Sequence, residues 1–129
     1  MNPTIVAVEP ISSFIRAKRI PVSPAVRLGD LVFVSGLPPF SDIGAIEPMT
    51  IERQTEVVIE QMRLCLEAAG SSLSKIAKCT VYADDPAHFD AINRVYARYF
   101  GDAPPARVFI CVAGWFGPFN VEIDCVAGV

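Results

Sequence analysis

Arg107, Glu122 and Asp124 are the residues of this sequence whose types and spacing are best suited to chemistry. They lie in two mainly apolar stretches, residues 106–112 and 119–127, which alternate as strands do and are joined by the turn-forming sequence GWFGP. The two stretches predict a β-hairpin that brings the three charged residues close together. An arginine there could hold a carboxylate through two parallel hydrogen bonds, and a neighbouring carboxylate could accept a proton or orient a water molecule.

Side-chain alternation sorts the predicted hairpin into two faces. The face that meets the helices is expected to hold the apolar set Val108, Ile110, Val112, Val121, Ile123 and Cys125. The opposite, helix-free face is then expected to hold Arg107, Phe109, Cys111, Glu122 and Asp124. Charges in the middle of a central strand are costly unless they are paired or hydrated. Two interpretations stay open: a structural ion pair between Arg107 and Glu122, or a functional site.

Two helices are predicted between the N-terminal region and the hairpin. Thr50 can cap the first helix, which continues with apolar residues at three- and four-residue steps to a stop at Gly70. The Asp85-Pro86 pair can begin the second helix, which ends near Gly101.

Strands are predicted at residues 31–35 and 76–83, both bounded by turn-forming or helical segments. The proline-containing stretch up to Pro24 is expected to be extended, with one edge strand. This order of elements predicts an α+β fold in which both helices pack on one face of a mostly antiparallel sheet.

The composition predicts one domain that associates with other copies of itself. A chain of 129 residues fits a single domain, here residues 1–129. Hydrophobic residues make up 52% of the chain, charged residues 19%, and the mean hydropathy is +0.41. Because a small domain leaves much of its surface in water, this apolar excess suggests that part of it is buried between subunits.

Charge and hydropathy exclude several classes of partner. A net charge of −3 and a pI near 5.0 give no basic surface for nucleic acid. No apolar run approaches the ~20 residues that a membrane-spanning helix needs. The first residues lack the features of a secretory signal, so a cytoplasmic location is expected.

The cysteines do not predict a metal or disulfide site. Four cysteines, at positions 65, 79, 111 and 125, lie in apolar contexts without a C-x-x-C pair, and His88 is the only histidine. We expect buried, reduced thiols. Cys111 is expected to share a strand face with Arg107, but no neighbouring cation is expected to activate it.

Five stretches in this order resemble the reactive-intermediate deaminase (Rid, or YjgF-type) family. They are SPAVRLGDLVFVSG at 23–36, QTEVVIEQMRLCLEAAGSSLSKIAKCTVY at 54–82, FDAINRVYARYF at 89–100, PPAR at 104–107 and VEIDCVA at 121–127. The resemblance implies a chorismate-mutase-like fold and a homotrimer whose sheets form an inner barrel. It also implies clefts between neighbouring subunits.

The resemblance implies a role for several individual residues. Arg107 matches the family arginine that holds the substrate carboxylate, and Glu122 matches the acidic residue that holds the hydrolytic water. Ser35 and Asn93 match residues that line the cleft. The other interpretations are a strand-end hydroxyl bonded to the backbone for Ser35 and an exposed helical asparagine for Asn93.

Two positions depart from the pattern of the family's active members. Ala25 stands where an aromatic residue is common, and Phe109 stands where a cysteine is common, so Phe109 adds bulk beside Arg107 in the substrate-binding region. Trp115 and Phe116, in the predicted hairpin loop, could close the cleft or belong to a subunit interface.

The leading hypothesis is hydrolysis of small 2-imino acids, or their enamine tautomers, to 2-oxo acids and ammonia. The imine carbon is already electrophilic, so neither a metal nor an organic cofactor is expected, and no nucleophilic side chain is required. The alternative is a trimeric protein on the same scaffold that binds small carboxylates without turning them over.

Overall fold

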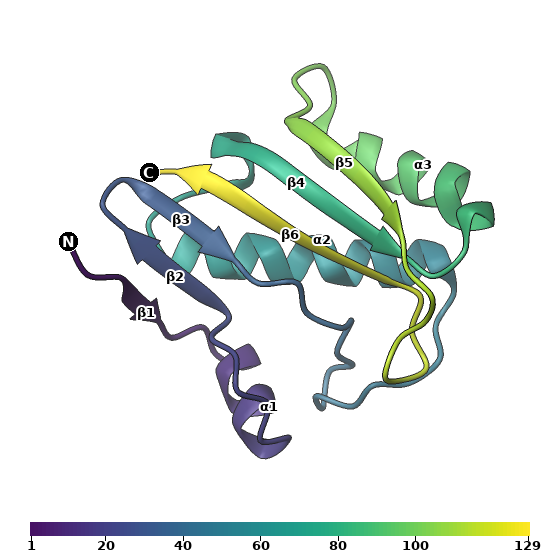
Figure 1. The fold of residues 1–129 in the computed structure, drawn as a ribbon, viewed down its shortest axis with the longest axis horizontal. Helices are drawn as coiled ribbons and strands as arrows, with labels where there is room; N and C mark the ends of the chain where they lie inside the picture. Colours follow the sequence, from purple (N-terminus) through teal and green to yellow (C-terminus); the bar gives the residue numbers. More distant parts are fainter.

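Six strands form one mixed sheet in the computed structural model, which describes residues 1–129 (Figure 1). The strands are β1 (Thr4–Val6), β2 (Ala25–Leu28), β3 (Leu31–Val34), β4 (Ile76–Ala83), β5 (Ala106–Cys111) and β6 (Val121–Gly128). Their order across the sheet is β1-β2-β3-β6-β4-β5, and every neighbouring pair is antiparallel except β4 and β5. The predicted α+β class with a mostly antiparallel sheet is confirmed.

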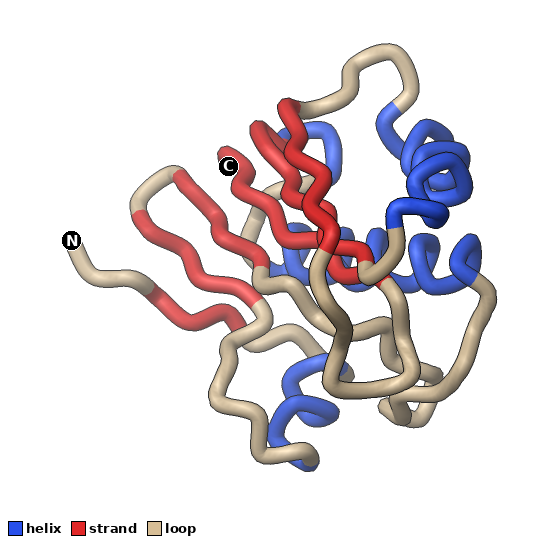
Figure 2. The backbone as a smooth tube through the Cα atoms, turned by 45° about the vertical axis from the view of Figure 1, so that its right-hand side comes forward, coloured by secondary structure: helices blue, strands red, loops and turns tan.

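The helices are α1 (Ile11–Ala17), α2 (Ile51–Ala68) and α3 (Phe89–Phe100), with short 3₁₀ helices at Leu73–Lys75 and Pro86–His88. Figure 2 shows α2 and α3 together on one side of the sheet, while α1 lies beside the loops at one end. The core is the layer of apolar side chains between the sheet and these helices, which includes the buried Cys65, Cys79 and Cys125. No helix is both long enough and apolar enough to span a membrane.

The predicted boundaries of α2 and the predicted end of α3 are confirmed, whereas the predicted start at Pro86 is a 3₁₀ turn that leads into α3 at Phe89. The Thr50 side chain accepts a hydrogen bond of 3.1 Å from the backbone N–H of Arg53. Gly70, just after α2, has a φ of +86°, which favours glycine. The Asp85 carboxylate accepts a hydrogen bond of 2.8 Å from the Ala87 N–H and so starts the turn that leads into α3.

The predicted hairpin between residues 106–112 and 119–127 is wrong. β5 pairs in parallel with β4, to which α3 connects it, and forms an edge of the sheet. β6 lies instead between β3 and β4. The reason is burial: β6 is covered almost throughout its length, whereas β5 leaves most of its residues exposed and therefore suits an edge. The segment between them crosses the end of β4, where the Asp84 N–H donates to the Asn120 carbonyl.

This pairing reverses the predicted faces of β5. Arg107 lies opposite Cys79 in the register, and Phe109 opposite Val81, so the Arg107, Phe109 and Cys111 side chains share the helix side. Val108 and Ile110 are on the helix-free side. The faces of β6 agree with the prediction: Val121, Ile123 and Cys125 are buried beneath the helices, and Glu122 and Asp124 lie on the helix-free face.

The N-terminal region holds more structure than predicted. β1 is an edge strand, as expected, but α1 lies in the stretch up to Pro24 that is predicted to be extended, and β2 follows that stretch at a place where the sequence predicts no strand. Ile11 and Ile15 of α1 are buried, and the Phe14 ring packs 5.6 Å from that of Phe40. A short helix next to a proline has too few residues for a clear helical period, so contacts of this kind decide its conformation.

Candidate active site

Arg107 is surrounded by aromatic rings and has no acidic partner within the chain. Its guanidinium carbon lies 4.9 Å from the centre of the Tyr96 ring, 5.8 Å from that of Phe109 and 5.9 Å from that of Phe89. The five ion pairs of the chain do not include Arg107. A half-buried guanidinium held on aromatic faces keeps its hydrogen-bond donors available for an anionic ligand.

Helix α3 carries unpaired polar atoms next to this arginine. Phe89, Asn93 and Tyr96 follow one another at four- and three-residue steps, so they share the face of α3 that contacts β5. The Asn93 Oδ1 atom is buried and has no hydrogen-bond partner in the chain, and the buried Tyr96 hydroxyl faces only the thiol of Cys79, which is a weak acceptor. Burial raises the pKa of Tyr96, which is only 6% exposed, so its hydroxyl keeps its proton and can donate. Asn93 is therefore not the exposed helical asparagine of the alternative interpretation.

Glu122 is a buried carboxyl without a hydrogen-bond donor. Its residue is 8% exposed, and no side chain or backbone N–H of the chain bonds to its carboxylate. Burial first, and then the negative charge of Asp124, raise its pKa from 4.5 to about 7. A group that titrates near neutrality can take up and release a proton at the pH of a cell. Gly36 leaves room for it, because a Cβ atom there would lie 3.0 Å from the Glu122 Oε1 atom.

Ser35 lies at the end of β3 on the helix-free side. Its hydroxyl donates a hydrogen bond of 2.6 Å to the Ser23 carbonyl, as the alternative interpretation predicts. Ser35 also lines a hollow of about 450 Å³, together with Val22, Val26, Phe33, Val34, Gly36, Asp124, Cys125 and Val126. Ala25, in contrast, is fully buried in the core, so the absence of an aromatic side chain there leaves this hollow unchanged.

One chain does not bring the predicted site residues together. Arg107, Phe109 and Asn93 lie on the helix side at the β5 edge, whereas Glu122 and Ser35 lie on the helix-free side. The interpretation of Arg107 and Glu122 as an ion pair within a hairpin is therefore wrong. A site that uses both residues requires a second copy of the chain.

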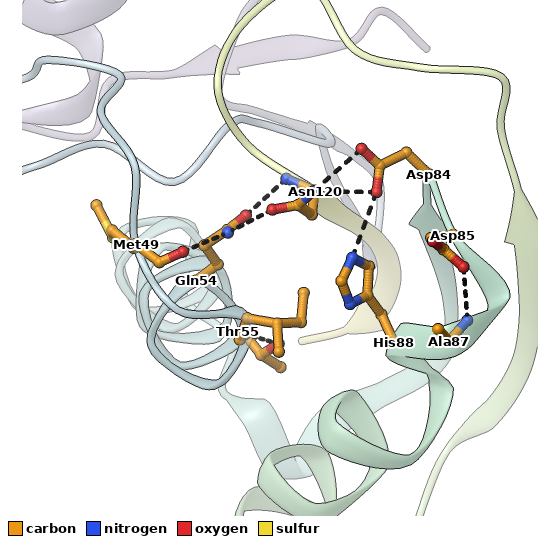
Figure 3. A network of polar contacts seen from close by, with 9 residues as sticks. Met49, Gln54, Thr55, Asp84, Asp85, Ala87, His88 and Asn120 are labelled. Carbon is orange, nitrogen blue, oxygen red and sulfur yellow. Dashed lines mark hydrogen bonds and ion pairs between the residues drawn. The ribbon is translucent and has the colours of Figure 1, made fainter.

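A polar network fixes the start of β6 and so positions Glu122 (Figure 3). The buried Gln54 of α2 donates to the Met49 carbonyl at 2.9 Å and to the Asn120 Oδ1 atom at 2.8 Å, and it accepts from the Asn120 N–H at 2.7 Å. Asn120 donates in turn to both oxygens of Asp84, which lies 3.7 Å from His88. These contacts tie α2, β4 and β6 together two residues before Glu122.

Phe89, Tyr96 and the Gln54 network were not predicted as part of a site. In the sequence, Phe89 and Tyr96 belong to the apolar stripe of α3, and their contact with Arg107 arises only from the parallel pairing of β4 and β5. The structure brings no group of three or more His, Cys, Asp or Glu side chains into an arrangement that could hold a metal ion.

Comparison with known proteins places this architecture in a family. A sequence model of the endoribonuclease L-PSP family matches residues 15–129. A RutC family protein of Pyrococcus abyssi is 38% identical over 108 residues, which are 83% of this chain and 85% of that protein. The chloroplastic Reactive Intermediate Deaminase A of Arabidopsis thaliana is 36% identical over 108 residues, which are 83% of this chain and 58% of that protein.

The solved structures agree with the sequence comparison. The crystal structure of YyfA, a Rid family protein of Yersinia pestis, matches with a TM-score of 0.83 at 26% identity, over 99% of this chain and 100% of that chain. The chain therefore belongs to the endoribonuclease L-PSP family, the family of the Rid and RutC proteins. This confirms the resemblance that its five sequence stretches indicate.

Proposed function

We propose that this protein hydrolyses small 2-imino acids, or their enamine tautomers, to 2-oxo acids and ammonia. The observation that carries the proposal is the Arg107 guanidinium, which lies on three aromatic rings without a carboxylate partner. A guanidinium binds a carboxylate through two parallel hydrogen bonds, and a 2-imino acid carries such a carboxylate. The relative named as a reactive intermediate deaminase supports this assignment.

The proposed site lies in clefts between the subunits of a homotrimer whose sheets form an inner barrel. The helix-free face exposes large apolar side chains, with Phe33 at 40%, Val108 at 42% and Ile110 at 39%, and a soluble protein rarely leaves such a face uncovered. If the β5 edge of one subunit packs on the helix-free face of the next, Arg107 of the first approaches Glu122 of the second. This arrangement resolves the separation of the two residues within one chain.

The proposed reaction needs only positioning and one proton carrier. Arg107 holds the substrate carboxylate and polarises the adjacent imine carbon. The imine nitrogen binds in its protonated form, and Glu122 accepts a proton from a water molecule as the water oxygen forms a bond to this carbon, which gives a carbinolamine. Glu122 then returns this proton to the amino nitrogen and takes the hydroxyl proton as the carbonyl forms. The carbon–nitrogen bond breaks, the 2-oxo acid leaves, and the departing ammonia carries away the last proton as ammonium. One water is consumed, and no cofactor takes part.

Asn93, Phe109 and Ser35 are proposed to contact the substrate. Asn93 has a buried oxygen without a donor, Phe109 provides an apolar wall 5.8 Å from the Arg107 guanidinium carbon, and Ser35 lines the hollow on the Glu122 side. The proposed setting is the cytoplasm, where dehydratases and amino-acid oxidases release such imines.

The experiment that tests this function is ammonia release from freshly generated 2-iminopropanoate. The protein is expected to accelerate release over the spontaneous rate, and the Glu122→Gln variant is expected to fall back to that rate. Calorimetry with pyruvate, which keeps the carboxylate but has no imine, serves as the binding control. Pyruvate binding without acceleration would favour the non-catalytic carboxylate binder, a possibility motivated by Phe109 at the position where a cysteine is common.

A further inference from the structure

Two carboxyl groups lie next to each other on the helix-free face of β6. Glu122 and Asp124 are two residues apart on one strand, so their side chains point the same way and start from Cα atoms about 7 Å apart. The Asp124 Oδ2 atom accepts a hydrogen bond of 2.9 Å from the Tyr82 hydroxyl. Tyr82 is the register partner of Glu122 rather than of Asp124, so its side chain reaches diagonally across β4 and β6.

The contacts of these two carboxyl groups differ. Asp124 has a donor in Tyr82, whereas Glu122 has none and is the more buried of the two. On this face, β4 contributes Tyr82, the uncharged Thr80 opposite Asp124 and, further along, the exposed Lys78, while β3 ends in the uncharged Ser35 and Gly36. The nearest acidic neighbour of Glu122 on its own strand is therefore Asp124. Ala106, Val108 and Ile110 are the β5 residues on this side, and none is charged.

In the proposed trimer, two neighbouring charges act on the pKa of Glu122 in opposite directions. A guanidinium brought close to Glu122 by the neighbouring subunit would stabilise the carboxylate and lower the pKa of Glu122. A base that has lost its proton affinity accepts a proton from water poorly. A second negative charge on the same strand acts in the opposite direction, because like charges disfavour ionisation of their neighbour.

We propose that Asp124, held by the Tyr82 hydroxyl, is a positioning residue that maintains the proton affinity of Glu122 by like-charge repulsion. This inference rests on the proposed function for its purpose, since it assigns Asp124 a role in the hydrolysis that Glu122 performs. Asp124 itself transfers no proton to the substrate. Its effect comes from its charge, and Tyr82 keeps that charge at a fixed place beside Glu122.

The test is a titration of the Glu122 carboxyl carbon by NMR in the full-length ¹³C-labelled protein. Asp124→Asn removes the charge but keeps the shape of the side chain, and it is expected to lower the pKa of Glu122 by about one unit. Tyr82→Phe removes the hydroxyl that fixes Asp124 but leaves the Asp124 charge, so the pKa of Glu122 is expected to fall by clearly less than in Asp124→Asn. Asp42→Asn, at an exposed loop position, is the matched control and is expected to cause no shift.

The outcomes separate this inference from the proposed function. An Asp124→Asn protein with an unchanged Glu122 titration would overturn the inference, even if the protein deaminates imines. A fall in Tyr82→Phe as large as that in Asp124→Asn would also overturn it, because the hydrogen bond rather than the charge of Asp124 would then be responsible. If the titration shifts as expected and no imine is hydrolysed, the charge effect stands and the proposed function fails. In an active enzyme, Asp124→Asn should shift the acidic limb of the pH profile of kcat/KM to lower pH.

Discussion

The guanidinium carbon of Arg107 lies 4.9 Å from the centre of the Tyr96 ring, and no acidic side chain of the same chain pairs with it. The aromatic ring of α3 holds the charge in place without neutralising it. A cation fixed in this way is ordered before a ligand arrives, so less entropy is lost when a carboxylate binds. If the proposed function is correct, Arg107 is therefore expected to contribute more to ligand binding than to the stability of the chain.

Replacement of Arg107 tests this assignment. Arg107→Ala is expected to abolish imine hydrolysis. The activation free energy derived from kcat/KM should rise by about 2–5 kcal/mol, the range for removing one partner of a buried charge pair. Arg107→Lys should also lose most of the activity, because an ammonium cannot form the two parallel hydrogen bonds. Steady-state kinetics and light scattering on the same samples provide the measurement. An intact trimer with normal turnover in either variant would contradict the assignment.

The activity should depend on pH through Glu122. Burial and Asp124 raise its pKa to about 7 in the single chain, and we expect Asp124 to keep it near this value beside the guanidinium of the neighbouring subunit. The carboxylate that accepts the proton from water is then present above pH 7 and is lost as the pH falls below it. We expect kcat/KM to fall about tenfold for each pH unit below pH 6, with one proton involved. A profile that is flat between pH 5 and pH 8 would show that Glu122 is not the base.

Mixed trimers test whether the two residues act from different subunits. Arg107→Ala and Glu122→Gln chains are each expected to be inactive alone. After unfolding and refolding together in equal amounts, about one quarter of the clefts should combine the intact Arg107 of one chain with the intact Glu122 of its neighbour. The measured activity should therefore return to about one quarter of the wild-type value. If both residues acted within one chain, the mixture would stay inactive.

The helix-free face should be covered in the assembled protein. Ile110→Lys places a charge on this face and is expected to dissociate the oligomer, because an unpaired buried charge is costly. Ile43→Lys is the matched control: Ile43 is 84% exposed in the loop before α2, so the oligomer should persist. Size-exclusion chromatography with light scattering distinguishes the two outcomes, and an Ile110→Lys trimer would refute the proposed packing.

The Gln54 network should contribute strongly to stability. Gln54→Met keeps the volume of the side chain but leaves the Met49 carbonyl and the Asn120 N–H without their partners (Figure 3). We expect a loss of about 2–3 kcal/mol in the free energy of unfolding, from denaturant titration. The neighbouring Arg53→Met change breaks only an exposed ion pair with Glu56 and should cost about 0.5 kcal/mol or less. Equal losses in the two variants would contradict a special role for the network.

The sequence predicts the parts of this fold that depend on local signals. Thr50 and Gly70 mark the ends of α2 because caps act within one helical turn, and Asp85 marks the approach to α3 in the same way. Alternation also gives the faces of β6 correctly, since Val121, Ile123 and Cys125 are strongly apolar and their neighbours are charged. Glu122 is thereby placed on the correct side of the sheet.

Pairing between distant strands is what the sequence does not reveal. Residues 106–112 and 119–127 are close in sequence, which favours a hairpin, but the greater burial of β6 places it between β3 and β4 instead. Once β5 pairs with β4 in parallel, Arg107 turns towards α3 and away from Glu122. Arg107 can thus be selected by its residue type, while its aromatic surroundings and its distance from Glu122 require the three-dimensional structure.

The position of β6 has a consequence for how the chain folds during synthesis. β6 joins the group β1-β2-β3 to the pair β4-β5, yet the ribosome makes it after all five. Until residues 121–128 emerge, the nascent chain holds two separate groups of strands with an open seam between them. The sheet closes only when β6 enters this seam, and β6 also carries Glu122. A nascent chain that stops before residue 121 therefore has neither a continuous sheet nor the proposed base.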